Sequence, residues 1–589
     1  MKYALLLITI SLLYSCETKK EGKLGSFPTR FETSEGRETA TYDEVIDFYI
    51  RLAREFPQIN VQTLGETDSG HPLHLVTFNP ESDFNFQKIS RNKLVLLINN
   101  GIHPGESDGI DATMLLFRDY ALGHLPPPGN TVLATIPVYN VGGALNRNGK
   151  TRVNQNGPES YGFRGNALNY DLNRDFVKSN TRNARTFARI FHTVNPDLFV
   201  DTHVSNGADY QYTLTHLFTQ HDKLGAPLGD YITQKFLPRL KDTLDASGWK
   251  ITPYVNVEGG PPDNGFVQFM DSPRYSTGYT ALWNTLGVML ETHMLKPYGN
   301  RVKGTYAFLL AMVKVAESQF EAISKVREAT GKRFADSRYY PLKWQVDSTR
   351  ADTLLFHGYR VDTLTSNVTG LPRLKYDRTK PYAKDIPYWD NFSARDSVAV
   401  PRAYLIKKDW RDIITLLDIN AIQYTTLDKD TVLTVESYSI TGTNTSTRPY
   451  EGHYPHFGTT VSSRLQPVSF GAGDYLIPTS QPGLRYLLET LEPEAVDSFF
   501  NWNFFDTTLQ QKEYFSSYVF EDLAAELLVS DEALRREFEE RKNKDAEFAA
   551  DGEAQLQWIY DNSPYREEAY LRYPVFRLPA VVPEVPDAP

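Results

Sequence analysis

The stretch LVLLINNGIHPGESDG, residues 94 to 109, joins an apolar run to a loop that holds a histidine and a glutamate three positions apart. The apolar run has the length and side chains of a buried β-strand, and the glycines and proline keep the loop out of a helix. In such a loop, His103 and Glu106 can both turn a donor atom toward one cation. Alone the pair is a weak signal, because a loop histidine and glutamate more often form a surface hydrogen bond.

A third donor follows a second apolar run, LFVDTHVSNG at residues 198 to 207. This run delivers His203 to the carboxyl end of a predicted strand, which is the edge where open α/β sheets gather their ligands. Two histidines and one carboxylate leave a fourth position open for water, as in catalytic zinc sites. Structural zinc sites are usually closed by cysteines, and this chain has one cysteine.

Two further stretches contain polar residues of the kind that act on a substrate. The run YGFRGNALNYDLNRDF, residues 161 to 176, places an arginine beside an asparagine; exposed arginines are usually solvated, but such a pair can also form a planar fork for a carboxylate. The run LGVMLETH, residues 286 to 293, places Glu291 in an apolar strand. Burying a charged carboxylate there destabilises the fold unless the group is paired or has a catalytic use. Burial also raises the pKa of a carboxyl group, which suits a general base.

The surrounding pattern predicts an α/β layer architecture from Phe27 to about residue 330. Strands are expected at 94–98, 131–139, 198–203 and 286–293, and helices at 41–56, 107–122 and 181–194. One long helix, residues 300 to 328 with Asn300 as its cap, is expected to close this domain. Residues 340 to 589 then predict a C-terminal α+β domain, rich in strands to about 480 and helical beyond.

Taken in order, the motifs HPGE, DLNRDF, DTH and MLETH resemble those of the zinc metallocarboxypeptidases of the carboxypeptidase A type. The resemblance covers residues 27 to 330, and four motifs in the right order are far more specific than any one. It implies a mixed central sheet flanked by helices and one Zn²⁺ per chain. It also implies hydrolysis of the last peptide bond of peptides that have a free C-terminal carboxylate.

The resemblance assigns roles to individual positions. It makes His103, Glu106 and His203 the zinc ligands, and Glu291 the general base and acid. It makes Asp171 the carboxylate that orients a zinc-binding histidine. Asn173 and Arg174 would bind the C-terminal carboxylate of the substrate, and Arg164 would polarise the scissile carbonyl group. Arg152 and Arg147 are rivals of Arg164 for the last role.

Other positions leave alternatives open. Asp175 stands where many members of this family have asparagine, and the side-pocket region, residues 271 to 285, shows no readable specificity pattern. Within it, Arg274 either favours acidic side chains or forms a structural salt bridge. Two tyrosines outside the motifs either cap the substrate or belong to the core: Tyr275 and Tyr279. Four histidines outside the motifs are predicted to be hydrogen-bonded or on the surface: His216, His293, His453 and His456.

Charge and the N-terminus bear on partners and location. A net charge of −11 and a pI near 5.7 argue against nucleic acid and anionic membrane surfaces as partners. Residues 1 to 15 resemble a bacterial lipoprotein signal peptide, with Cys16 as the lipidated residue and a polar tether to residue 26. We therefore expect an exported protein held in the cell envelope by a lipid anchor only, on either side of the outer membrane. The alternative is an ordinary signal peptide with an incidental cysteine.

Two other functions remain compatible with the sequence. A hydrolase of related fold could act on cell-wall peptides, which also expose a free carboxylate. A catalytically silent protein could instead bind peptide C-termini or glycans. Glu291 together with all three metal ligands argues against the silent protein, because a protein without activity would be free to lose its base.

Overall fold

The computed structural model describes residues 27 to 580, so the predicted signal peptide, Cys16 and the tether lie outside the described residues. Its centre is an eight-stranded mixed sheet. The strand order is β1 (Ile59–Glu66), β2 (Pro72–Phe78), β4 (Thr131–Ile136), β3 (Leu94–Asn99), β5 (Leu198–Ser205), β9 (Leu286–His293), β6 (Leu214–Phe218) and β7 (Ile251–Pro253). The predicted fold class, a mixed sheet flanked by helices with further sheets beyond it, is confirmed.

The middle of this sheet is parallel and its edges are not. Strands β4, β3, β5 and β9 run parallel, whereas β1, β2 and β6 join antiparallel neighbours. Parallel strands are normally buried on both faces, and every residue of β3, β5 and β9 is buried. Their carboxyl ends therefore meet at one edge, directly before the loops that carry the predicted motifs.

Helices cover the sheet as their apolar periodicity predicts. The principal ones are α2 (Tyr42–Glu55), α4 (Asp108–Ala121), α6 (Arg182–Val194), α9 (Leu237–Asp245), α10 (Ser276–Ala281) and α11 (Tyr298–Ser318). Helix α2 begins with a capping box, in which Thr41 and Glu44 each bond the other's backbone N–H. No helix between Phe27 and Ala580 is both long enough and apolar enough to cross a membrane.

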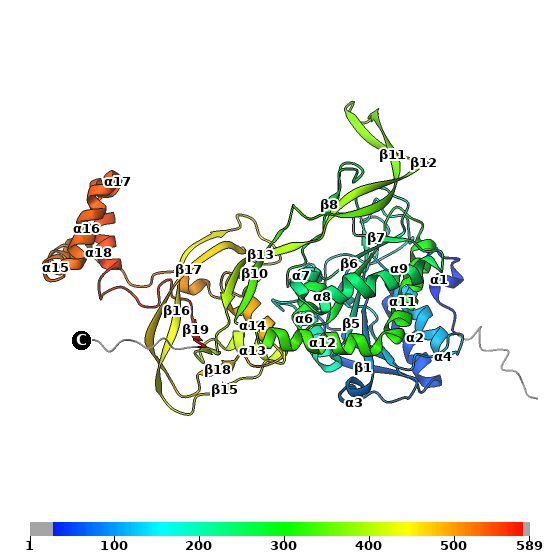
Figure 1. Cartoon of the computed structure of the whole chain (residues 1–589), viewed down its shortest axis with the longest axis horizontal. Helices are drawn as coiled ribbons and strands as arrows, with labels where there is room; N and C mark the ends of the chain where they lie inside the picture. The colour runs from blue at the N-terminus through cyan, green and yellow to red at the C-terminus, as the bar shows by residue number, and fades with distance from the viewer. Residues whose placement is uncertain (1–26, 581–589) are drawn as a thin grey trace, which may run out of the picture.

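The predicted long helix is two helices, which corrects one expectation. Helix α11 ends at Ser318 and α12 (Phe320–Ala335) begins two residues later, because Gln319 leaves helical geometry with φ −124° and ψ 19°. The Tyr231 hydroxyl bonds the Gln319 side chain at this break. Asn300 is not the cap either, since α11 begins after Pro297. Helix α12 then leads toward the C-terminal part of the chain (Figure 1).

We call residues 27 to 335 the α/β part and residues 339 to 580 the C-terminal part. The latter contains a six-stranded sheet of β15 (Thr425–Thr426), β18 (Tyr475–Pro478), β14 (Ala403–Ile406), β19 (Val575–Leu578), β16 (Thr431–Thr445) and β17 (His456–Phe470). A smaller pair joins β10 (Tyr339–Val346) to β13 (Phe392–Ala399), and α13 (Arg411–Ile419) and α14 (Leu484–Leu491) pack nearby. The predicted division of the chain near residues 330 to 340 stays a prediction.

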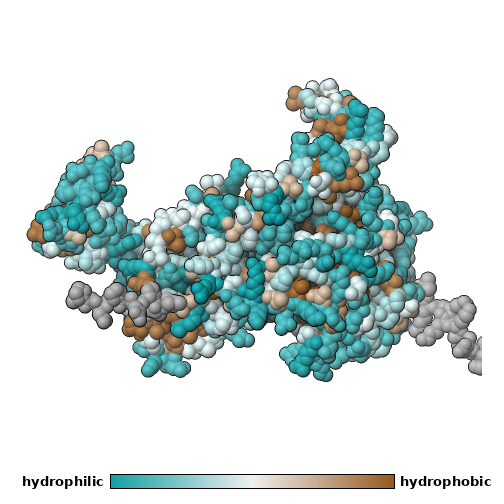
Figure 2. Space-filling model, viewed as in Figure 1, coloured by the Kyte–Doolittle hydropathy of each residue, from teal (hydrophilic) through white to brown (hydrophobic). Residues whose placement is uncertain are grey.

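Two elements project from this body. The hairpin of β11 (Asp352–Thr365) and β12 (Pro372–Trp389) rises from the α/β part, where β12 pairs with β8 (Phe266–Val267). Figure 2 shows hydrophobic surface along this hairpin. Val368, in the turn between the two strands, is exposed. At the opposite end, a helical group with its own small core stands apart in orange and red (Figure 1): α15 (Ser517–Ser530), α16 (Glu532–Lys544), α17 (Ala546–Ala550) and α18 (Gly552–Asp561).

Candidate metal centre and active site

Three of the predicted side chains converge at the carboxyl edge of the sheet. His103 and Glu106 lie in the loop between β3 and α4, and His203 lies on β5; each is 3% exposed. One donor atom from each lies within 4.8 Å of the others. Among residues 27 to 580, this is the one group of histidine, cysteine and carboxylate side chains with donors gathered in this way.

Glycines allow the loop to approach its neighbours. The N–H of Glu106 donates to the carbonyl of His103 at 2.8 Å, which closes a tight turn. A Cβ on Gly105 would lie 2.6 Å from Cδ of Arg152, and one on Gly109 would lie 2.0 Å from Oγ1 of Thr202. Glycine at these two positions, one in the loop and one in the first turn of α4, lets the side chains of Arg152 and Thr202 pack directly against the backbone.

Both histidines turn the same ring nitrogen toward Glu106. Nδ1 of His103 lies 3.2 Å from Oε1 of Glu106, and Nδ1 of His203 lies 3.0 Å from Oε2. Their Nε2 atoms point outward to carboxylates: His103 to Asp171 at 2.9 Å, and His203 to Asp201 at 2.9 Å. Such outer partners fix the tautomer and the orientation of metal-binding histidines.

Asp201 is a site residue that the sequence reasoning missed. It precedes His203 by two positions on β5, so that both side chains lie on one face of the strand. The signal was present in the DTH motif, where an aspartate occupies that position within an otherwise apolar run. Despite burial, Asp201 and Glu106 raise the pKa of His203, because both carboxylates favour the charged imidazolium.

The arginines around the site differ in their partners. Arg152 Nη2 lies 2.9 Å from Oε1 of Glu106, whereas Arg164 makes two hydrogen bonds to Oδ2 of Asp171, at 3.1 and 2.8 Å. Arg147 instead donates to backbone carbonyls, including that of Ser160 at 2.8 Å. Arg152 and Arg164 therefore border the site, whereas Arg147 stabilises the neighbouring backbone through its hydrogen bonds. Burial alone would raise the pKa of Asp171, but His103 and the arginines hold it well below its ordinary range.

Asn173 and Arg174 lie in the short helix η1 (Leu172–Arg174) beside the same opening. The guanidinium of Arg174 lies 4.6 Å from the ring centre of Tyr275. These residues border a cavity of about 760 Å³, which we call the site pocket. It is lined by His103, Glu106, Arg152, Arg164, Asn173, Arg174, His203, Leu217, Tyr254, Phe269, Tyr275, Met289 and Glu291, among others.

Glu291 lies on the strand next to His203, one of the three candidate metal ligands. In the parallel pairing of β5 with β9, His203 and Glu291 are register partners. Burial raises the pKa of Glu291 to about 8; His203 opposes this shift, and the carboxylates of Glu106 and Asp201 add to it. Its Oε2 atom is buried and has no hydrogen-bond partner among the described residues. Glu291 is therefore a buried carboxyl group with a raised pKa beside the three candidate metal ligands.

The C-terminal part reaches this site, which the sequence did not predict. Glu451 accepts a hydrogen bond from the backbone N–H of Asp171 at 2.8 Å. Asp497, fully buried, accepts hydrogen bonds from the backbone N–H and the Nε of Arg274, at 2.9 and 2.7 Å. Of the two readings of Arg274, the structure thus shows the salt bridge, and Arg274 does not line the site pocket.

The structure also locates the two tyrosines and four histidines whose roles the sequence left open. Tyr275 lines the site pocket, whereas Tyr279 is fully buried in the core. His293 is hydrogen-bonded through both ring nitrogens, as predicted. His453 and His456 also have side-chain partners. His216 is an exception to the prediction, because it is buried and neither ring nitrogen has a partner among the described residues.

Comparison with known proteins gives similarity along most of the chain. The chain is 22% identical to "Carboxypeptidase 2" of Trichophyton tonsurans over 497 residues, which are 81% of this chain and 86% of the relative. It is 22% identical to "Probable carboxypeptidase 2" of Arthroderma benhamiae over 495 residues, covering 80% and 87%. These fungal relatives bear out the resemblance to zinc carboxypeptidase-like proteins that the motifs indicated. No protein-family profile matches the chain.

Solved structures similar to the chain cover about half of it. A metallo-carboxypeptidase from Burkholderia cenocepacia is 18% identical, covers 48% of this chain and 70% of its own, and has a TM-score of 0.35. Carboxypeptidase A from Helicoverpa armigera is 14% identical, covers 48% of this chain and 74% of its own, and has a TM-score of 0.36.

Proposed function

We propose that this chain is a zinc metallocarboxypeptidase that hydrolyses the last peptide bond of peptides with a free C-terminal carboxylate. The similarity to named carboxypeptidases supports an enzyme of the metallopeptidase class. One observation carries the finer assignment: the donors of His103, Glu106 and His203 gather at one point, and Glu291 faces them from the adjacent strand.

The residues present fit one zinc ion. Two imidazoles and one carboxylate are the donor set of many catalytic zinc sites. Nδ1 of His103 is buried without a hydrogen-bond partner among the described residues, although a carboxylate lies beside it, and a cation would satisfy both. Asp171 and Asp201 already hold the outer nitrogens of the two histidines. When bound, Zn²⁺ supplies Lewis-acid chemistry: it acidifies water and polarises a carbonyl group.

Glu291 would move the proton. Its raised pKa favours acceptance of a proton from the attacking water, and the protonated carboxyl can then deliver that proton to the leaving amine. Arg152 and Arg164 both border the site pocket and can stabilise negative charge that develops on the scissile carbonyl oxygen. Arg164 retains our preference because it is not engaged as closely with Glu106 as Arg152, at 3.7 Å against 2.9 Å.

Asn173 and Arg174 would bind the C-terminal carboxylate of the substrate. Arg174 lies over Tyr275 and lines the site pocket, so its guanidinium is positioned rather than free in solvent. An arginine fork binds a carboxylate through two parallel hydrogen bonds, and such binding orients the last peptide bond. This arrangement supports the proposed requirement for a free C-terminal carboxylate.

The proposal is tested by release of C-terminal amino acids from a mixed peptide library. The protein, beginning after Cys16, is assayed as prepared, after chelation, and after zinc is restored. We expect trimming that chelation abolishes and zinc restores, and no trimming of the same peptides with amidated C-termini. Absence of trimming in a zinc-loaded sample would contradict the proposal. Activity on cell-wall fragments with D-residues alone would identify the related hydrolase instead.

We also propose that the chain is exported and anchored through a lipid on Cys16. The support is the sequence of residues 1 to 16 alone, which lie outside the described residues. Metabolic labelling with an alkyne fatty acid in a bacterial host should label the natural chain and not the Cys16→Ser variant. Equal labelling of both chains, or no labelling of either, would contradict the anchor.

A further inference from the structure

A second cavity lies behind the site pocket, and we call it the rear pocket. Its volume is about 490 Å³. Along β6, His216 lines the rear pocket and the next residue, Leu217, lines the site pocket. The same alternation occurs at the end of β7, where Pro253 and Tyr254 line the rear and site pockets respectively. Because successive strand residues face opposite sides of a sheet, the two cavities lie back to back.

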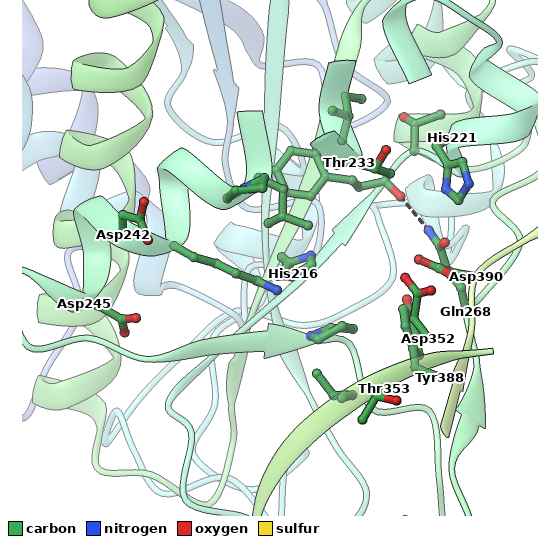
Figure 3. Close-up of a pocket in the computed structure, with 18 residues that line it drawn as sticks. His216, His221, Thr233, Asp242, Asp245, Gln268, Asp352, Thr353, Tyr388 and Asp390 are labelled. Carbon is green, nitrogen blue, oxygen red and sulfur yellow. Dashed lines mark hydrogen bonds between the residues drawn. The ribbon is translucent and has the colours of Figure 1, made fainter. Parts of the chain in front are cut away.

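His216 is the clearest sign that the rear pocket is built for a ligand. Its side chain is 5% exposed and projects into the cavity from β6 (Figure 3), and neither Nδ1 nor Nε2 has a hydrogen-bond partner among the described residues. Leaving a buried polar group without a hydrogen-bond partner destabilises the fold unless a ligand or water supplies one. Burial, and then the nearby Lys241, hold the pKa of His216 well below its ordinary value. The imidazole is therefore neutral and presents one N–H donor and one acceptor nitrogen.

Opposite charges line the same cavity without closing on each other. The side-chain ammonium group of Lys241, on α9, has no hydrogen bond or close ion pair within the described chain. Burial lowers its pKa, and Asp245 and Asp390 oppose that shift through their charge. Asp390 and Asp352 come from either end of the β11–β12 hairpin region, and Figure 3 shows them together on one side of His216. Asp242 and Asp245, also on α9, line the cavity on the side away from Asp352 and Asp390 (Figure 3), so the cavity holds the ammonium group of Lys241 and four carboxylates.

We propose that the rear pocket binds a free α-amino acid. Its carboxylate would be received by the ammonium group of Lys241 and the imidazole N–H of His216, and its ammonium group by Asp352 and Asp390. The volume lies in the ordinary range of small-molecule sites and leaves room for a side chain. The choice of an amino acid over another small zwitterion rests on the proposed function, because amino acids are what that reaction releases.

Other ligand classes fit the cavity less well. A metal ion alone is disfavoured, because in the described chain the donors that gather tightly enough are those of His103, Glu106 and His203. An inorganic anion would meet Lys241 but also the carboxylates of Asp352 and Asp390. An apolar ligand would leave Lys241 and His216 without a partner. A molecule with one carboxylate and one ammonium group can bind Lys241 and His216 through the first and the lining carboxylates through the second.

Isothermal titration of the zinc-loaded protein with the twenty amino acids tests this site. Three variants separate the rear pocket from the site pocket: Lys241→Met, Arg174→Ala, and the matched control Lys235→Met, whose exposed side chain lies outside the rear pocket. We expect at least one amino acid to bind in a phase that Arg174→Ala and Lys235→Met retain and that Lys241→Met weakens at least tenfold. Asp390→Asn should weaken the same phase, and melting curves establish that each variant is folded.

Acetate and methylammonium, the two charged halves of an amino acid, complete the test. Each should bind at least tenfold more weakly than the amino acid. The proposal is overturned if every binding phase disappears in Arg174→Ala, or if Lys241→Met leaves binding unchanged. It is also overturned if inorganic phosphate or acetate alone binds as tightly. Because binding is measured without peptide, failure of the carboxypeptidase assay would leave this result interpretable.

Discussion

The α/β part and the C-terminal part contribute to the same site in different ways. In the α/β part, His203 and Glu291 lie on adjacent parallel strands, and the short loop after a third strand supplies His103. In the C-terminal part, Glu451 and Asp497 lie far along the chain and contact the backbone or the supporting residues of the site. In the proposed mechanism the α/β part supplies the reacting groups and the C-terminal part contacts the residues that support them, so mutations in the two parts should differ in what they change.

The largest effect is expected from removing the C-terminal part altogether. Arg485 is buried and donates to the carbonyls of Ala281 and Lys223, both at 2.7 Å, and Trp283 stacks on Tyr486. A chain that ends after residue 336 should therefore aggregate or melt at much lower temperature, and lose activity. Solubility and circular dichroism check this.

A matched deletion sharpens the same comparison. Residues 513 to 566 contain the helices α15 to α18, which have their own core. Their ends meet where the N–H of Lys512 donates to the Glu567 carboxylate at 2.8 Å. Replacing residues 513 to 566 with a short glycine–serine linker should leave both folding and turnover near the natural values. Loss of activity in this deletion, or full activity in the chain that ends after residue 336, would contradict the supporting role of the rest of the C-terminal part.

A point mutation at the interface should have the next largest effect. Asp497→Asn removes the charge that faces Arg274 and leaves that guanidinium without its partner in a mostly buried place. Breaking such a pair costs about 3–5 kcal/mol. Chemical denaturation should show that loss, together with a higher KM, because the neighbouring Tyr275 lines the site pocket. The control Asp506→Asn, at a half-exposed carboxylate, should change stability by less than about 1 kcal/mol.

Glu489 provides a pH-dependent test of the interface. Burial raises its pKa from 4.5 to about 7, against the opposing effects of Lys223, of the Tyr340 hydroxyl that donates to it at 2.9 Å, and of Arg485. A carboxyl group with a raised folded pKa contributes stability fully below its unfolded pKa and loses it as pH rises through the folded value. Glu489→Gln should therefore gain about 2 kcal/mol relative to the natural chain between pH 5 and pH 8. An unchanged difference across that range would show that Glu489 is ionised throughout.

The smallest effect is expected at Glu451, which bonds Asp171, the partner of the proposed zinc ligand His103. Glu451→Ala leaves the N–H of Asp171 without its acceptor, and Asp171 orients His103. Partners of metal-binding histidines typically change affinity or activity by about 10–100-fold, so one step further out we expect about 3–10-fold in kcat/KM. Glu451→Gln keeps an acceptor oxygen and should retain most of the activity. Equal losses in both variants would mean that the charge of Glu451, rather than its hydrogen bond, matters.

The strands and loops that build the site could be predicted from the sequence because their signals are local. A continuous apolar run predicted β3, β5 and β9, and polar residues directly after or within those runs predicted His103, His203 and Glu291. Parallel strands bring such positions to one edge, so the convergence followed from the pattern.

Contacts between distant segments could not be predicted in the same way. Nothing around Glu451 or Asp497 distinguishes them from exposed acidic residues, because their role comes from packing against residues some 220 to 280 positions earlier. The helix break at Gln319 is similar: it contains neither glycine nor proline, and its partner Tyr231 lies on another helix. His216 was misjudged because periodicity gives burial but not hydrogen bonding.

The central claim is that His103 holds a catalytic metal and that Glu291 moves the proton. Zinc content and peptide turnover should be measured on the same samples of the natural chain, His103→Ala and Glu291→Gln. The account predicts about one zinc per natural chain, loss of both zinc and activity in His103→Ala, and near-full zinc with at least a hundredfold lower kcat in Glu291→Gln. Zinc loss in Glu291→Gln, or turnover that survives in it, would contradict the account.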